Sequence, residues 1–407
     1  MRNWAGNVTF SASEVARPVD LDELRRTVAA ASRVHAVGSR HSFSTVADTP
    51  GTLISLEDMP PAVEIDSAAR QARVAAALRY GELVPALDEA GLAVPNLASL
   101  PHISVVGACA TGTHGSGDGN QGLAASVAGF DLVTASGDVV TLDRSADGFE
   151  GSVVSLGALG VATSVTLDLV PSFTVRQWVY DGLPAASLAE QIFASAYSVS
   201  VFTTWRDPSV FDQVWIKAAS GWESAPPTWH GARLADGPRH PVPGMPVEYA
   251  NQQGGVPGPW HARLPHFRAE FTPSAGEEIQ SEYLVPRSYL TDAVAAIAPL
   301  APRIAPLLLI SEIRSVAADS LWLSPAYQRD TIGLHFTWHQ DPAVSQVLPL
   351  IESALAPFEP RAHWGKVFSP SMGFPYPRLA DFAALADRYD PGGKFRNSFT
   401  ERALAGQ

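Results

Sequence analysis

Cysteine is almost absent from this sequence of 407 residues, in which Cys109 is the single example. One cysteine excludes an intramolecular disulfide and any zinc site built from cysteines. The histidines show no accompanying carboxylate spacing that would indicate a metal site, so we expect no bound metal. A chain without disulfides is compatible with a reducing cytoplasm, where we expect the protein to be located.

Positive charge is also scarce, because 28 Lys and Arg residues stand against 41 Asp and Glu residues, a formal net charge of -13. Nucleic-acid binding needs clustered Lys and Arg, so we expect no nucleic-acid partner. No stretch reaches the ~18 apolar residues that a membrane span requires. Met1 to Phe10 lacks the apolar core of a secretory signal. We therefore expect a soluble protein without a membrane partner, and a monomer is compatible with the sequence.

The length of the chain predicts two domains, because 407 residues exceed what one ordinary core accommodates. Helical and extended patterns alternate along it, which indicates a mixed fold. Extended segments are expected at 34–37, 73–77, 131–135, 139–142, 161–170, 307–316 and 331–338. Helices are expected at 80–90, 287–300, 344–355 and 379–389. Residues 220–265, dense in Pro, Gly, Trp and His, are typical of a long covering loop or a flexible lid.

A glycine ends the first expected strand and opens the pentapeptide Gly-Ser-Arg-His-Ser at residues 38–42. Glycine at the end of a strand lets backbone N–H groups turn toward an anion such as a phosphate. Taken alone, however, the pentapeptide is more typical of an ordinary turn with a surface histidine.

Small residues fill a second segment, from Ser104 to Gly117. Small side chains allow a ligand to approach the backbone closely, and hydroxyls supply donors for a pyrophosphate. Tight backbone packing is the alternative, although it does not easily explain so long a run without a helical pattern. The chain lacks the Gly-x-Gly-x-x-Gly pattern and the phosphate-loop Gly-Lys-Ser/Thr, which argues against ordinary NAD or ATP binding.

The combination of residues 38–43 with residues 99–117 resembles the vanillyl-alcohol-oxidase type of FAD flavoproteins. Within that family, the chain is most similar to the branch of alditol and xylitol oxidases, near the sugar-lactone oxidases. The similarity to this branch is carried by residues 240–246, 256–260, 282–287, 364–366 and 394–397.

The resemblance implies an α+β fold with two domains. An FAD-binding domain would comprise residues 1–172 and be completed by residues 368–407. An inserted α+β substrate domain, or cap, would comprise residues 173–367.

The resemblance also implies that FAD is bound covalently through His41. Arg40 stands where relatives often have glycine, so the local phosphate contacts would differ there. The residues implied in cofactor binding are Ala36, Val37, Gly38, Ser39, Arg40, His41, Ser42, Ser99, Ser104, Gly107, Thr111, Gly112, Thr113, His114 and Val161.

Charged residues interrupt the two apolar runs expected as strands 307–316 and 331–338. Glu312 and Arg314 would point to one face of their strand, as would His335 and Thr337 of theirs. The residues alone favour a structural ion pair and a hydrogen-bonded core histidine over a polar site.

The resemblance reverses that preference and implies a substrate site. Its substrate-binding residues would be Ser99, Glu312, Arg314, Thr337 and Lys366. The implied catalytic residues are Arg314 and Lys366, which would stabilise a developing alkoxide, and Glu312 or His335, either of which would accept the hydroxyl proton.

The activity implied is oxidation of a terminal hydroxyl of an alditol, such as xylitol or sorbitol, to the aldehyde, with O2 reduced to H2O2. A small polyol and O2 would be the partners. A sugar-1,4-lactone oxidase or dehydrogenase shares the flavin motifs and is the alternative enzyme. A flavin-binding or carbohydrate-binding protein without catalysis is the alternative from another class.

Overall fold

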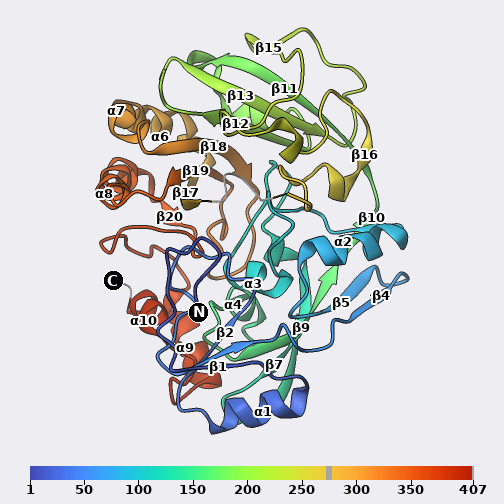
Figure 1. The fold of residues 1–407 in the computed structure, drawn as a ribbon, viewed down its shortest axis with the longest axis vertical. Coiled ribbons are helices and arrows are strands. Elements are labelled where there is room, and N and C mark those ends of the chain that lie inside the picture. Colours follow the sequence, from blue (N-terminus) through green and yellow to red (C-terminus); the bar gives the residue numbers. More distant parts are fainter. Residues whose placement is uncertain (272–276, 406–407) are drawn as a thin grey trace.

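The computed structural model describes residues 1–271 and 277–405, so the last two residues of the expected C-terminal segment lie outside the described residues. Two bodies are stacked along the longest axis (Figure 1). We call the body of the N-terminal and C-terminal segments the flavin domain, and the body built on the largest sheet the cap. This mixed arrangement of two domains confirms the predicted fold class. The domain limits at 172/173 and 367/368 stay predictions.

The flavin domain contains three sheets. Its five-stranded sheet is antiparallel, in the order β4 (Val63–Asp66), β5 (Gln71–Ala75), β9 (Val161–Asp168), β7 (Val127–Val133) and β8 (Val139–Asp143). A parallel sheet has the order β1 (Glu14–Ala16), β3 (Thr52–Ser55) and β2 (Val34–Val37). A small antiparallel pair joins β10 (Val170–Pro171) and β6 (Leu92–Ala93).

The cap is one ten-stranded antiparallel sheet. Its order is β14 (Thr228–Trp229), β15 (Ala232–Leu234), β11 (Thr174–Pro184), β13 (Val210–Ala218), β12 (Ser198–Thr203), β18 (Leu308–Val316), β19 (Thr331–His339), β17 (Glu278–Pro286) and β20 (Arg361–Ala362), with β16 (Gly258–Pro259) also paired to β11. All its strands lie between residues 174 and 362, which is consistent with the predicted cap.

Helices in the flavin domain are α1 (Leu21–Ala30), α2 (Tyr80–Glu89), α3 (Val105–Ala110), α4 (Phe149–Val153), α9 (Leu379–Tyr389) and α10 (Ser398–Leu404). Those of the cap are α5 (Glu190–Phe193), α6 (Leu290–Ile297), α7 (Ala301–Ile304) and α8 (Val344–Leu355). Short 3-10 turns are η1 (Leu123–Ser126), η2 (Ala185–Ser187), η3 (Val247–Tyr249), η4 (Trp260–Ala262), η5 (Arg287–Tyr289), η6 (Ala298–Leu300) and η7 (Ala356–Phe358). No described helix is long and apolar enough to cross a membrane.

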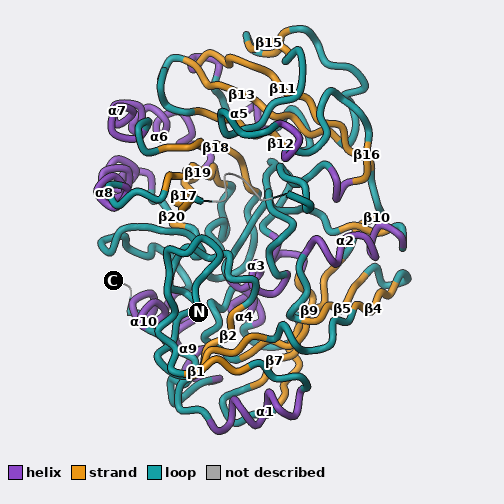
Figure 2. The backbone as a smooth tube through the Cα atoms, viewed as in Figure 1, coloured by secondary structure: helices purple, strands orange, loops and turns teal. Residues whose placement is uncertain are grey.

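The two faces of the cap sheet differ in chemistry because side chains alternate along each strand. Ile313, Leu334 and Tyr283 are buried in one apolar core with residues of α6 and α8, and Figure 2 shows these helices gathered on one side of the sheet. Their neighbours along the same strands, Glu312 and His335, point to the opposite face. This face therefore carries Glu312 and His335 away from the helix-covered core.

The C-terminal segment packs on the flavin domain, as Figure 1 shows by placing α9 and α10 beside the N-terminal segments. The backbone N–H of Val34 donates to the carbonyl of Lys394 at 2.9 Å. The Lys394 ammonium donates to three carbonyls, those of Val28, Ala29 and Ala135. These bonds are consistent with a flavin domain completed by the C-terminal residues.

Three expectations about local structure need correction or refinement. The run of small residues has a helix, α3, over Val105–Ala110, although no helical pattern marked it. The expected helix at 287–300 is divided into η5, α6 and η6. Residues 220–265 carry three short strands, β14, β15 and β16, and two 3-10 turns, η3 and η4, among irregular segments, which favours the covering-loop alternative over a lid.

Candidate active site

A cavity of about 280 Å³ is lined by residues of both the flavin domain and the cap. One wall is formed by the turn after β2 and by α3, and the other by β17, β18, β19 and the loop after β20. This cavity brings together the two N-terminal motifs and the polar face of the cap sheet.

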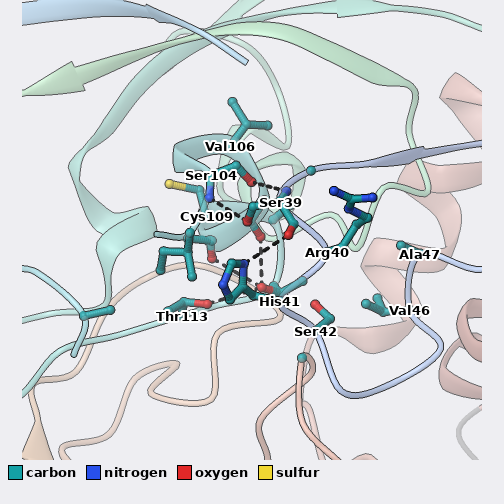
Figure 3. A pocket seen from close by; sticks show the side chains of 18 of the residues that line it. Ser39, Arg40, His41, Ser42, Val46, Ala47, Ser104, Val106, Cys109 and Thr113 are labelled. Carbon is teal, nitrogen blue, oxygen red and sulfur yellow. Dashed lines mark hydrogen bonds between the residues drawn. The ribbon is translucent and has the colours of Figure 1, made fainter. Parts of the chain in front are cut away.

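The two N-terminal motifs are joined by a reciprocal pair of hydrogen bonds (Figure 3). The backbone N–H of Ser104 donates to Ser39 Oγ at 2.9 Å, and that of Ser39 donates to Ser104 Oγ at 3.3 Å. A Cβ atom on Gly38 would lie 2.2 Å from Ser104 Oγ, so glycine is required at this close approach. Arg40 has a positive φ of 63°, a conformation that glycine adopts without strain.

His41 follows this turn and is stacked against Trp4, with ring centroids 5.3 Å apart. Its Nδ1 atom lies 3.1 Å from the carbonyl oxygen of Ser39, which places the ring proton on Nδ1. Its Nε2 atom is buried and has no hydrogen-bond partner among the described residues. Burial, with the nearby His102 and Arg79, lowers the pKa of His41 to about 4. The ring is therefore neutral at pH 7, with a free lone pair on Nε2.

Most residues implied in cofactor binding line this cavity. Gly112 and Val161 do not lie in its wall. Val161 is fully buried in a small core with Leu24 and Val28, while its neighbours Gly160 and Ala162 reach the cavity. The implied residues that do line the cavity are Ala36, Val37, Gly38, Ser39, Arg40, His41, Ser42, Ser99, Ser104, Gly107, Thr111, Thr113 and His114.

The residues implied in substrate binding and catalysis all line the cavity: Ser99, Glu312, Arg314, His335, Thr337 and Lys366. Strand register explains why four of them meet. Glu312 is paired with His335 across β18 and β19. Arg314 and Thr337 lie on the same face, each two residues along its own strand, on opposite sides of this pair because the strands are antiparallel. Arg314 donates to Ser99 Oγ at 3.4 Å, so the cap contacts the flavin-domain loop here.

Lys366 is placed by the loop that follows β20. The backbone N–H of Phe43 donates to the carbonyl of Gly365 at 2.7 Å, and Ser44 Oγ donates to that of Trp364 at 2.6 Å. Trp364 is fully buried and stacks on Tyr376 at 4.8 Å. The loop is thus held against the first motif on one side and a rigid aromatic cluster on the other.

A buried carboxylate, Glu282 on β17, joins the cationic residues of the site. Its Oε1 atom accepts from Arg314 at 2.8 Å, and its Oε2 atom accepts from Lys366 at 2.7 Å. Burial opposes its ionisation, but Arg314 and Lys366 hold the pKa of Glu282 well below its usual range. Burial likewise opposes the charge of Arg314, but Glu282 and Glu312 raise its pKa. Glu282 and Arg314 are therefore ionised at pH 7, while burial lowers the pKa of Lys366 against the raising effect of Glu282.

His335 is neutral, because burial and the nearby Lys366 lower its pKa well below the ordinary value. Gln280 Nε2 donates to Glu278 at 2.5 Å, so its amide oxygen faces the ring. That oxygen lies 3.1 Å from His335 Nε2, which must therefore carry the ring proton. The lone pair of His335 is left on Nδ1, which has no partner among the described residues.

Comparison with known proteins finds relatives that match nearly the whole chain. An alditol oxidase from a Streptomyces species is 50% identical over 99% of this chain and 99% of its own. The chain belongs to the alditol oxidase family. An FAD binding domain model matches residues 12–143 of this family member, and a D-arabinono-1,4-lactone oxidase model matches residues 276–403.

More distant relatives also match this chain over nearly its whole length. An L-gulono-1,4-lactone dehydrogenase of Mycobacterium tuberculosis is 28% identical over 99% of this chain and 98% of its own. Among solved structures, a solvent-stable cholesterol oxidase has a TM-score of 0.76 at 15% identity, over 99% of this chain and 97% of the other. A cholesterol oxidase from B. sterolicum has a TM-score of 0.78 at 13% identity, over 99% and 96%. These likenesses show the fold.

The cavity fits the FAD that members of the alditol oxidase family bind. Small residues such as Gly38, Ser104 and Gly107 line its flavin-domain wall. His41 and His114 there each hold a buried ring nitrogen without a hydrogen-bond partner among the described residues, and that of His114 lies 3.5 Å from Glu282. Small residues permit the close approach of a large planar cofactor, and a neutral imidazole nitrogen is chemically able to bond to it.

Glu282 and two neighbouring histidines resemble a metal site at first sight. The side-chain ligand atoms of His114, Glu282 and His363 lie within 4.8 Å of one another. Arg314 and Lys366 already neutralise Glu282, however, and a divalent cation beside two positive charges would be repelled. The absence of a metal in this alditol oxidase family member stays a prediction.

Several residues of the site were not assigned a role from the sequence. Gln280 and Glu282 alternate along β17, a polar period of two that could have indicated a strand facing the site. His266 also contacts Glu312, and Lys217 contacts His266. His266 lies in an irregular segment, and Lys217 lies in a strand that the sequence did not predict. No local pattern could have placed them together.

Replacing the central carboxylate tests how far the cluster depends on it. Glu282→Gln leaves Arg314 and Lys366 buried without their shared counter-charge. We expect the free energy of unfolding to fall by about 3–5 kcal/mol, measured by urea denaturation. Asp58→Asn, which removes an exposed partner of Arg17, is the control and should leave the midpoint unchanged. Equal stability of Glu282→Gln and the parent protein would contradict the account.

Proposed function

We propose that this protein oxidises a terminal hydroxyl of an alditol, such as xylitol or sorbitol, to the aldehyde. FAD, bonded to His41, would supply the two-electron oxidation, with O2 as the final acceptor and H2O2 as the second product. The name of the relative that is 50% identical supports the alditol as substrate class. A cytoplasmic location stays a prediction.

The observation that carries this proposal is the concentration of hydrogen-bonding groups on one wall of the cavity. Ser99, Thr337, Glu312, Arg314 and Lys366 supply hydroxyl, carboxylate and cationic groups to a single space. A polyol has no charge and little apolar surface, so its recognition depends on such donors and acceptors. A site of this kind rejects analogues that lack hydroxyls, because its polar groups would be left unpaired.

The cationic residues would act on the oxygen of the reacting hydroxyl. As the hydroxyl loses its proton, negative charge develops on its oxygen, and Arg314 and Lys366 would stabilise that charge. Both are held in place by Glu282 before substrate arrives. Their arrangement therefore costs no reorganisation during the reaction.

His335 is our candidate for the group that accepts the hydroxyl proton. Its ring is neutral, its Nε2 proton is directed at Gln280, and its Nδ1 lone pair is unused by any described residue. Glu312, in contrast, already accepts from His266 at 3.0 Å and faces Arg314 at 3.5 Å. We assign Glu312 to binding a substrate hydroxyl and His335 to general-base catalysis.

A sugar-1,4-lactone oxidase or dehydrogenase is the second candidate. The match of residues 276–403 to the D-arabinono-1,4-lactone oxidase model favours it, and these residues include most of the polar wall. The lower identity of the lactone-enzyme relatives, 28% against 50%, places it second.

The activity itself is tested with purified protein in air. We expect xylitol and sorbitol to give equimolar aldehyde and H2O2. Their kcat/KM should be at least about tenfold above that for L-gulono-1,4-lactone, because one polar group of the site left without a partner lowers kcat/KM by about this factor. Peroxide detection and aldehyde derivatisation measure both products, and an artificial acceptor distinguishes a dehydrogenase. A preference for the lactone would establish the second candidate, and turnover of neither compound would reject both.

The proposed flavin bond is tested by acid precipitation. We expect the precipitated protein to stay yellow, whereas His41→Ala should release all of its flavin, because the single bonding nitrogen is lost. His230→Ala, at an exposed site, is the control and should keep the colour in the pellet. A colourless pellet from the parent protein would remove the covalent bond and leave non-covalent FAD.

Lys366→Ala tests the stabilisation of the developing charge. We expect kcat for a polyol to fall about 10²-fold, since one charge-stabilising donor is removed, while the flavin absorbance of the folded protein is retained. Steady-state kinetics and the visible spectrum provide the two measurements. Lys394→Ala, at a lysine that does not line the cavity, should leave kcat unchanged. Normal turnover of Lys366→Ala would exclude this role.

A further inference from the structure

Behind Glu312 lies a chain of two buried side chains that the proposed reaction does not use. Glu312 Oε1 is 3.0 Å from Nε2 of His266, and Nδ1 of His266 is 3.0 Å from Nζ of Lys217. Lys217 is 2% exposed and His266 is 4% exposed. His266 also lines the cavity, whereas Lys217 lies outside its wall. The chain therefore leads from the substrate site into the interior of the cap.

Lys217 has three hydrogen-bond partners, which are the carbonyls of Leu264 and Pro265 and the ring of His266. An ammonium group has three donors and no acceptor, so these partners use all three. Burial lowers the pKa of Lys217 to about 7, opposed by the charge of Glu312. The geometry requires Lys217 to donate to His266 whenever it is protonated, which makes Nδ1 the acceptor of the ring.

The proton of His266 is consequently on Nε2, directed at Glu312. Burial and then Lys217 lower the pKa of His266 to about 4, so the ring carries a single proton. Phe202 and Trp215 flank the ring at centroid distances of 5.5 and 5.4 Å. The charged groups that act on it are Lys217, Glu312 and Arg314. Lys217 and Glu312 contact the ring nitrogens and fix the orientation of the ring directly.

The same residue also holds a substrate-facing loop of the flavin domain. The backbone N–H of His266 donates to the carbonyl of Ser99 at 3.1 Å. Ser99 Oγ in turn accepts from Arg314 at 3.4 Å. A change in His266 thus reaches both Glu312 and Ser99, two of the groups proposed to bind the substrate.

We propose that Lys217 and His266 are positioning residues for substrate recognition. The Lys217 ammonium fixes the tautomer of His266, and the Nε2 proton of His266 holds the Glu312 carboxylate ionised and oriented toward a substrate hydroxyl. This inference rests on the proposed function for the meaning of Glu312, but the tautomer of His266 does not depend on which substrate is oxidised.

A purely structural role for Lys217 is the alternative. A buried lysine that donates to two backbone carbonyls could simply hold the segment around Leu264 and Pro265. Lys394 is a matched example, because its ammonium donates to three backbone carbonyls in the flavin domain. A structural role would change stability on replacement of either lysine, without a selective change in KM.

The tautomer is tested by ¹⁵N NMR of protein labelled at histidine, at a pH between the pKa of His266, about 4, and the pKa of Lys217, about 7. The His266 signals are identified by their loss in His266→Gln. We expect the Nε2-protonated neutral form in the parent protein, and a mixture of tautomers in Lys217→Met. A cationic ring, or an Nδ1-protonated ring in the parent protein, would overturn the proposal. An unchanged tautomer in Lys217→Met would overturn it as well.

Kinetics test the consequence for substrate. We expect Lys217→Met to raise the KM for xylitol roughly 10- to 100-fold, as for loss of a charge-assisted hydrogen bond, with little change in kcat. Lys394→Met should lower stability without changing KM. In His266→Gln, an amide N–H replaces the donor toward Glu312 and no tautomer remains to be fixed. Adding Lys217→Met to His266→Gln should therefore change KM little further.

These outcomes distinguish failure of the positioning role of Lys217 from failure of the proposed function. Equal, additive effects of Lys217→Met in both backgrounds would show a structural role and overturn the proposal. If no polyol is turned over by the parent protein, the proposed function fails, and the NMR result alone decides the Lys217–His266 assignment. If Lys217→Met does not fold, the NMR of the parent protein and the KM of His266→Gln still decide the assignment. Because His266→Gln keeps an N–H donor toward Glu312, a KM raised more than about tenfold in this variant would overturn the proposal.

Discussion

The rest of the site depends on the ion pairs that the carboxylate of Glu282 makes with Arg314 and Lys366. This carboxylate is fully buried, and it accepts from Arg314 of β18, on the same face of the sheet, and from Lys366 in the loop after β20. Without it, Lys366 would lie in the interior unpaired and Arg314 would keep only Glu312 as a counter-charge, at a cost of several kcal/mol. With it, both cations are fixed beside one cavity. The proposed substrate recognition and charge stabilisation would therefore both depend on this one ion cluster.

The alternation of the cap strands explains why a single sheet provides both a core and a site. Ile313 and Leu334 pack with α6 and α8 on one face, while Glu312 and His335 point into the cavity from the other. The flavin domain closes the cavity with the turn after β2 and with α3. Loops from each domain contact the other, through Arg314 and Ser99 and through Phe43 and Gly365. The wall for the cofactor and the wall for the substrate are thus fixed relative to each other.

Local patterns predicted much of the fold. Strand β2, helices α8 and α9, and most of β18 and β19 were expected within one or two residues, because their apolar periodicity is strong. Strands β11, β12 and β13 were missed, since β12 is buried on both faces and shows no clean alternation. Glu312 and Arg314 were placed on one face correctly. Glu282, His266 and Lys217 were not assigned, because their contacts join segments far apart in the sequence, which only the tertiary fold determines.

The central claim is that the polar wall around Glu282 binds the hydroxyls of an alditol beside the flavin. Its most direct test is a crystal structure of the FAD-loaded protein with xylitol bound under anaerobic conditions. We expect xylitol hydroxyls within hydrogen-bonding distance of Glu312, Arg314, Thr337 and Lys366, with the terminal carbinol facing the flavin ring and His335 beside its oxygen. Xylitol bound outside this cavity, or held there without contacts to Arg314 and Lys366, would contradict the account.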